Sequence, residues 1–248
     1  MRFATSLAAT LIMALSAPAA AQTYIYEEVV EEWVETSASR IVSPQLARAE
    51  SESLGAYGPF RVVDASHAAI VGVTNGRSPA DFERMLAAYP GITTIYFVDC
   101  PGTHDDRANF RLGRMIRARG IAAIVPEGGS VRSGAVDLFL AGAEREIADG
   151  SEFAVHAWLD YRGRESHDYA PDSPEHRKYL DYYREMGMEQ DEAVRFYAMT
   201  NSVPFESALW LSGEEMRDWI VPAGMQDFQG VEPELPRLAY LDLDAALN

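Results

Sequence analysis

The fold is decided by the stretch Thr93-Thr94-Ile95-Tyr96-Phe97-Val98 and by the turn that follows it, Asp99-Cys100-Pro101-Gly102-Thr103. A continuous apolar run of this length that ends in a Pro-Gly turn is typical of a strand buried on both faces. Strands of this kind occur in parallel sheets that are covered by helices. The stretch therefore predicts an α/β protein.

The segments on both sides of this strand alternate between strand and helix. Turn residues separate short apolar runs from longer runs with the period of a helix. The predicted strands are residues 60–64, 68–73, 93–98, 121–125 and 153–158, and the predicted helices are residues 79–88, 106–119, 133–143, 175–186 and 190–200. A capping box at Ser212-Gly213-Glu214-Glu215 predicts one more short helix. This order of elements predicts an α/β fold with mainly parallel strands and C-terminal helices.

The chain has 248 residues, of which 48% are hydrophobic, and this suffices for one sizeable core. Its N-terminus has the features of an export signal, namely Arg2, the apolar run 8–15 and Ala19-Ala20-Ala21. We predict a signal peptide at residues 1–21, an N-terminal extension at 22–59, one domain at 60–223 and a tail at 224–248. The mature protein is expected to be periplasmic or secreted, and the alternative is an uncleaved N-terminal anchor helix. No later segment has the roughly 20 apolar residues that a membrane span needs.

The formal net charge of the chain is -17 and its pI is near 4.6. Such a charge repels nucleic acid and anionic membrane surfaces, so neither is an expected partner. Lys178 is the only lysine, so a Ser–Lys dyad would need this residue. The cluster His104-Asp105-Asp106 suggests metal ligands, but three adjacent residues do not converge easily on one ion and no paired histidine spacing accompanies them. We expect neither a metal nor another cofactor.

Two residues have the chemistry of a nucleophile and a base. Ser133 precedes the apolar helical segment 134–140, where free N–H groups favour a nearby anion. The alternative is that Ser133 only caps the helix. His156 lies in the apolar segment 153–158, where it is either a base tuned by partial burial or a satisfied core histidine.

The order of these features resembles the Clp-type serine protease and crotonase superfamily, in particular its exported bacterial branch. The features are the Pro101-Gly102-Thr103 turn after a buried strand, the serine that opens a small-residue helix, and Val155-His156. Thr103 precedes Ser133 by 30 positions and Ser133 precedes His156 by 23 positions, close to the spacing of the Clp-type pattern. The resemblance covers about residues 60–223.

This resemblance implies a spiral of repeated β-β-α units. It implies Ser133 as the nucleophile, His156 as the base, and the backbone N–H groups of Thr103 and Gly134 as donors to an oxyanion. It further implies a peptide or small acyl substrate and self-association into a homo-oligomer.

Two positions depart from the family pattern. Thr103 replaces the second glycine of the turn, so a branched residue stands where freedom of φ is useful. Ala208 stands where the acid of the triad is expected, with Glu206 close by and Asn201 as a second possible third member. A Ser–His dyad is the remaining possibility, with a backbone carbonyl or water at the other ring nitrogen.

These features predict a periplasmic Clp-like serine hydrolase, a peptidase, that uses a Ser–His dyad or an incomplete triad. The alternative is a non-catalytic binding or scaffold protein that retains the fold. An α/β-hydrolase is disfavoured because the sequence around Ser133 departs from Gly-x-Ser-x-Gly. A crotonase-type acyl-CoA enzyme is disfavoured because an exported protein would rarely meet coenzyme A.

Overall fold

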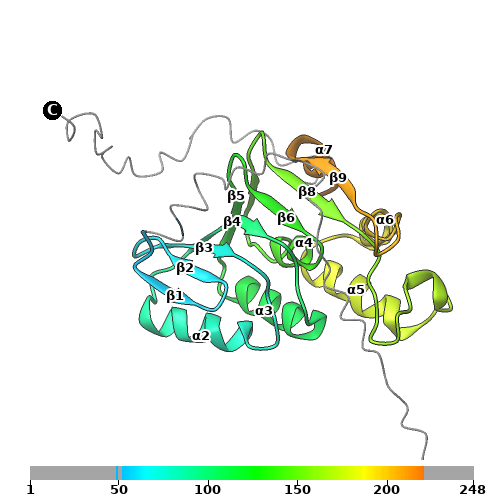
Figure 1. Cartoon of the computed structure of the whole chain (residues 1–248), viewed down its shortest axis with the longest axis horizontal. Coiled ribbons are helices and arrows are strands. Elements are labelled where there is room, and N and C mark those ends of the chain that lie inside the picture. Colours follow the sequence, from blue (N-terminus) through cyan, green and yellow to red (C-terminus); the bar gives the residue numbers. More distant parts are fainter. Residues whose placement is uncertain (1–48, 50–51, 221–248) are drawn as a thin grey trace, which may run out of the picture. The chain divides into compact units, whose positions relative to one another are not determined.

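A nine-stranded sheet runs through the part of the chain that the computed structural model describes, residues 49 and 52–220 (Figure 1). Its strands are β1 (Gly55–Tyr57), β2 (Phe60–Val62), β3 (His67–Val71), β4 (Thr94–Cys100), β5 (Ala122–Val125), β6 (Ser130–Arg132), β7 (Arg145–Ile147), β8 (Glu152–Val155) and β9 (Leu209–Ser212). The helices are α2 (Ser78–Ala88), α3 (Asp106–Ala118), α4 (Gly134–Phe139), α5 (Pro174–Glu185), α6 (Gln190–Thr200) and α7 (Gly213–Ile220), with a 3₁₀ turn η1 (Ser166–Asp168). The predicted signal peptide and C-terminal tail lie outside the described residues.

The sheet is parallel at its centre and antiparallel at its edges. β3, β4, β6 and β8 are parallel neighbours, whereas β1 and β2 pair antiparallel at one edge and β8 and β9 at the other. This arrangement confirms the prediction of an α/β fold with mainly parallel strands and C-terminal helices.

The sheet divides at β4. Residues 94–96 of β4 pair with β5, whereas residues 99 and 100 pair with β6. β7 then extends the branch of β5, and β8 extends the branch of β6. The chain shows the expected β-β-α order at β2-β3-α2 and again at β5-β6-α4.

β4 is buried on both faces, as its apolar run predicts. Ile95 and Phe97 pack into the main hydrophobic core, and Tyr96 and Val98 pack into a smaller cluster that includes Val71. The alternation follows from the strand period of two residues. Helices α2 and α3 lie side by side along the strands of the N-terminal half (Figure 1), where their apolar faces close the main core.

Some elements differ from the sequence prediction. The strands β1, β6, β7 and β9 are not predicted, because each has three or four residues and shows no clear period. The helix predicted at 133–143 ends at Phe139, and the chain turns at Gly142, where a Cβ would lie 2.5 Å from the Cβ of Ala123. The strand predicted at 153–158 ends at Val155, so His156 follows the strand rather than lying within it.

Candidate active site

Three neighbouring parallel strands bring the predicted site residues to one edge of the sheet. β4 leads into Gly102 and Thr103, β6 ends directly before Ser133, and β8 ends directly before His156. The strands lie in the order β4-β6-β8. Because parallel strands place their carboxyl ends at the same edge, where ligands bind in open α/β sheets, the turn, the serine and the histidine meet there.

Ser133 has an unusual backbone conformation, with φ 51° and ψ -133°. It is the only non-glycine residue with positive φ in the described part of the chain. Its N–H donates to the carbonyl oxygen of Ala154 at 2.8 Å, which prolongs the pairing of β6 with β8. Its hydroxyl makes no capping hydrogen bond to α4. Ser133 therefore holds the N-cap position of α4 without capping the helix through its hydroxyl.

The turn after β4 fits closely against Ser133. Gly102 has φ +135°, and a Cβ on it would lie 3.0 Å from the Cβ of Ser133. Thr103 has no positive φ, so the branched residue that replaces the family glycine causes no backbone strain. A Cβ on Gly134 would lie 2.5 Å from Cγ2 of Thr103, so the threonine requires glycine at the first position of α4. The N–H of Gly134 lacks an intrahelical partner because it belongs to the first turn.

A buried pair of polar side chains, Thr74 and Asn109, holds the turn and the helix together. Thr74 Oγ1 donates to Asn109 Oδ1 at 3.0 Å, and Asn109 Nδ2 donates to the carbonyl oxygen of Gly134 at 2.6 Å. The N–H of Thr74 also donates to the carbonyl oxygen of Gly102 at 3.0 Å. Sequence reasoning missed both residues, because no motif links positions so far apart.

His156 is half-buried, and its Nδ1 lies 2.8 Å from the carbonyl oxygen of Ala157. A carbonyl oxygen only accepts hydrogen bonds, so Nδ1 carries the proton and Nε2 keeps a free lone pair. The ring of Phe205 packs edge-on against the imidazole, with the centroids 4.8 Å apart. The backbone thus fixes the tautomer that a general base needs.

Neither predicted third member forms a hydrogen bond with the imidazole in the part of the chain that the structure describes. Glu206 is exposed and lies outside the cavity at Ser133. Asn201 lines that cavity, but its Nδ2 donates to the carbonyl oxygen of Tyr197 at 2.8 Å. No hydrogen bond between Ser133 Oγ and the ring of His156 is present among these residues, although both line the same cavity.

This cavity has a volume of about 260 Å³. Its lining residues are Thr103, His104, Asp106, Ser133, Gly134, Val136, Asp137, Val155, His156, Trp158, Leu159, Tyr179, Tyr183, Thr200, Asn201 and Phe205. All four predicted site residues, Ser133, His156, Thr103 and Gly134, belong to it. A larger and more open hollow between β9 and α7 is lined by no histidine, so it offers no comparable base.

Asp137 is a functional candidate that sequence reasoning missed. Burial raises the pKa of its carboxyl to about 8, a hydrogen bond from Tyr183 opposes this rise, and the nearby charge of Asp106 adds to it. The hydroxyl of Tyr183 donates to Asp137 Oδ1 at 2.9 Å. The carboxyl is therefore largely neutral at pH 7.

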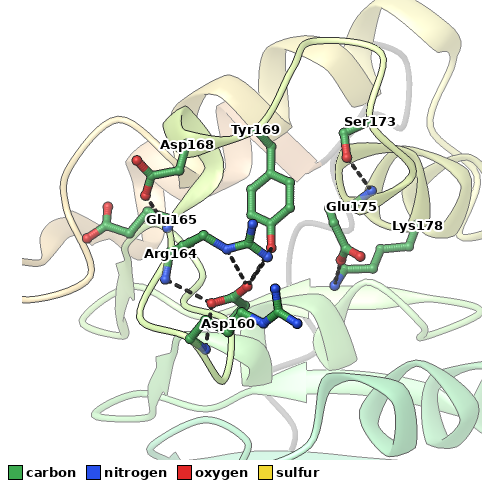
Figure 2. A network of polar contacts seen from close by, with 9 residues as sticks. Asp160, Arg164, Glu165, Asp168, Tyr169, Ser173, Glu175 and Lys178 are labelled. Carbon is green, nitrogen blue, oxygen red and sulfur yellow. Dashed lines mark hydrogen bonds and ion pairs between the residues drawn. The ribbon is translucent and has the colours of Figure 1, made fainter.

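A polar loop at residues 159–173 contributes Leu159 to this cavity and lines a neighbouring hollow with Asp160, Arg164 and Tyr169. Asp160 organises the loop by accepting hydrogen bonds from the guanidinium of Arg164, the hydroxyl of Tyr169 and the backbone N–H groups of Arg162 and Arg164 (Figure 2). Burial disfavours the charge of Asp160, but these hydrogen bonds outweigh it and hold its pKa well below the ordinary value. One carboxylate thus holds the loop in a defined conformation.

Lys178 does not line the cavity at Ser133. Its Nζ donates to Glu175 Oε2 at 2.6 Å on the exposed side of α5 (Figure 2). It instead lines a neighbouring hollow of about 580 Å³. This hollow and the cavity at Ser133 share the lining residues His104, Asp106, Trp158 and Leu159. A Ser–Lys pairing therefore has no support in this geometry.

No family model matches the sequence, and no curated protein matches it significantly. Among solved structures the chain is similar to two variants of a protein described as "1510-N membrane-bound stomatin-specific protease". A serine-to-alanine variant shares 19% identity over 62% of this chain and 74% of that chain, with a TM-score of 0.43. A lysine-to-alanine variant in complex with a substrate peptide shares 18% identity over 60% and 72%, with a TM-score of 0.42.

The chain is also similar to an asparagine-to-aspartate variant of ClpP1 from Listeria monocytogenes. The two share 16% identity over 63% of this chain and 88% of that chain, with a TM-score of 0.45. No helix of the described residues is long and apolar enough to cross a bilayer.

Proposed function

We propose that this chain is a periplasmic serine hydrolase of the peptidase type, with Ser133 as the nucleophile and His156 as the general base. The observation that carries the proposal is the convergence of three strand ends on one cavity. This cavity is lined by a strained serine whose hydroxyl makes no capping hydrogen bond and by a histidine whose backbone contact leaves Nε2 free to accept a proton. Strained backbone of this kind is concentrated at functional sites.

In the proposed reaction, Ser133 Oγ attacks the substrate carbonyl carbon while its proton passes to His156 Nε2. The carbonyl oxygen becomes an oxyanion, which the N–H groups of Thr103 and Gly134 stabilise. The C–N bond then breaks, and the leaving amine takes the proton from Nε2. Water attacks the acyl-enzyme in the same way, and its proton returns through Nε2 to Ser133 Oγ. The hydrogen bond between serine and histidine forms on substrate binding, as is common in such sites.

The carbonyl of Ala157 takes the place of the triad acid in this proposal. It orients the ring of His156 and fixes its tautomer, but it brings no negative charge to stabilise the imidazolium. We therefore propose a Ser–His dyad. Replacing Glu206 by glutamine is expected to leave the reaction intact, because this side chain is exposed and lies outside the cavity.

A serine-reactive fluorophosphonate tests the proposal directly. The wild-type protein and the control Ser207→Ala, which removes an exposed hydroxyl away from the cavity, are expected to be labelled. Ser133→Ala is expected to abolish labelling, and His156→Ala is expected to slow peptide hydrolysis by about a thousandfold or more. Labelling that survives Ser133→Ala would contradict the assignment.

The second candidate function is a non-catalytic binding or scaffold protein that retains the fold. The lack of a hydrogen bond between Ser133 and His156 in the described structure favours it. A folded wild-type protein that neither reacts with the fluorophosphonate nor cleaves any member of a peptide library would establish this alternative.

The cellular location and the assembly state need separate tests. N-terminal sequencing of the protein from a periplasmic fraction is expected to begin at Gln22, after the predicted signal peptide. Retention of residues 1–21 would instead indicate an uncleaved anchor. Sedimentation of the mature protein tests the homo-oligomer that the family resemblance implies.

A further inference from the structure

Asp137 extends the cavity away from the nucleophile. It lies on α4, four residues after Ser133, which holds the N-cap position with a non-helical backbone. Both residues line the same cavity, and only 7% of the surface of Asp137 is exposed. The cavity therefore runs from the serine to a buried carboxyl group, and the mechanism does not use this carboxyl.

Two side-chain oxygens in this cavity receive no hydrogen bond from the described residues. Asp137 Oδ1 accepts from Tyr183, but the structure shows no donor to Oδ2 among the described residues. Asn201 Oδ1 is buried in the same lining and has no hydrogen-bond partner. A buried amide oxygen is normally paired, so Asn201 Oδ1 indicates that the natural occupant of the cavity brings an N–H donor, and the ionised carboxylate of Asp137 can accept a second one.

The walls of the cavity also suit a cation. None of the described lining residues is a lysine or an arginine, whereas Asp106 adds a second carboxylate. The rings of Trp158 and Tyr179 form part of the lining. Each already binds a cation, because Lys178 Nζ lies 5.2 Å and 5.3 Å from their respective ring centroids. Aromatic faces attract cations in this way.

We propose that the part of the cavity between Ser133 and Asp137 binds a lysine or arginine side chain of the substrate, with Asp137 and Asn201 accepting its N–H donors. Lysine carries its charge at the end of a flexible four-carbon stem, so the charge can reach a carboxyl that lies away from the attacked bond. This inference rests on the proposed function, because it places the cationic residue directly before the peptide bond that Ser133 attacks.

The protonation state of Asp137 gives the pocket a measurable signature. The pKa of the Asp137 carboxyl is about 8, so its protonated form predominates at pH 7. A bound cation favours the charged form of a neighbouring carboxyl and lowers its pKa. Binding of a cation at pH 7 is therefore expected to release a proton from Asp137.

Isothermal titration calorimetry with n-butylguanidinium and its uncharged analogue n-butylurea tests the pocket. Titrations at pH 7 in two buffers of different ionisation heat reveal the released proton. We expect butylguanidinium to bind about 10- to 100-fold more tightly than butylurea and to release up to about one proton. Asp137→Asn, which keeps the shape but not the charge, is expected to remove both effects. Asp172→Asn, at an exposed carboxyl outside the cavity, is the matched control.

Equal binding of the two probes by the wild-type protein, or no binding of either, would overturn the inference without any need for a variant. This binding assay is independent of turnover. A protein that binds butylguanidinium through Asp137 but fails to react at Ser133 would retain the cation pocket while refuting the hydrolase. A protein that reacts at Ser133 but does not bind butylguanidinium would support the hydrolase and refute the cation pocket.

Two fluorogenic peptides that differ only in lysine or norleucine before the cleaved bond complete the test. The wild-type protein is expected to show kcat/KM about 10- to 100-fold higher for the lysine peptide. Asp137→Asn is expected to make the two values similar, whereas Asp172→Asn keeps the preference. Preference of the wild-type protein for norleucine would overturn the inference and leave the assignment of Ser133 intact.

Discussion

Ser133 holds a backbone conformation that glycine adopts more easily. A non-glycine residue at φ 51° and ψ -133° is strained by about 1–3 kcal/mol. Ser133→Ala removes the hydroxyl and keeps the strain, whereas Ser133→Gly removes both. We therefore expect Ser133→Gly to be more stable than Ser133→Ala by about 1 kcal/mol in urea denaturation. Equal stability of the two variants would show that the fold does not strain this position.

Asp137 makes the stability of the protein depend on pH. Its pKa is raised from 3.8 in the unfolded chain to about 8 in the folded protein, so the folded state binds more protons between these values. The contribution of Asp137 to the free energy of unfolding therefore falls as the pH rises from about 4 to about 8. Asp137→Asn is expected to remove this fall. Chemical denaturation at pH 5 and pH 8 measures it, and an unchanged slope in the variant would contradict the shift.

The proposed nucleophile and base are more visible in the sequence than the buried polar residues around them. Ser133 and His156 stand out because each lies in a locally apolar segment at a spacing that resembles a known family. Asn109 and Asp137 act through contacts with distant parts of the chain, the first with Thr74 and the second with Tyr183. No local pattern reveals such contacts, because they depend on how the helices pack.

Among the helices and strands, too, a local sequence pattern does not reveal elements that depend on tertiary contacts. Long segments such as β4 and α3 have enough residues for their period to show, and both are predicted nearly to their ends. The three-residue strand β6 has no period of its own. It becomes a strand because its neighbours β4 and β8 supply hydrogen bonds on both sides. Hydrogen bonding to neighbouring strands, rather than the local strand propensity of its residues, therefore creates the strand that ends directly before Ser133.

The loop at residues 159–173 depends on Asp160 for its shape. This one carboxylate joins Arg164, Tyr169 and two backbone N–H groups, so its removal leaves several donors without an acceptor (Figure 2). We expect Asp160→Ala to speed trypsin cleavage after the exposed Arg162 several-fold while the rest of the fold stays resistant. Asp172→Ala, outside this network, is the control. Unchanged cleavage kinetics would show that the loop is held by other contacts.

At the scale of the whole molecule, the site depends on β4 remaining paired with its neighbouring strands. β4 pairs with β3 on one side and with both β5 and β6 on the other, so the turn that carries Thr103 is anchored to both branches of the sheet. The only cysteine of the chain, Cys100, is the last residue of this strand. Its thiol is buried and lies 3.5 Å from the carbonyl oxygen of Ile70. The accessibility of the Cys100 thiol therefore shows whether β4 has separated from its neighbouring strands.

Burial, with a smaller effect of the nearby charge of Asp99, raises the pKa of Cys100 well above the ordinary value, so the folded protein holds an unreactive thiol. Alkylation by iodoacetamide should then require β4 to separate from its neighbouring strands. We expect the labelling rate to be very low in water and to rise with urea with the same denaturant dependence as global unfolding followed by circular dichroism. Rapid labelling that does not depend on urea would mean that β4 separates from β3 or β6 while the rest of the protein stays folded. The edge that brings Thr103, Ser133 and His156 together would then be a locally mobile part of the sheet.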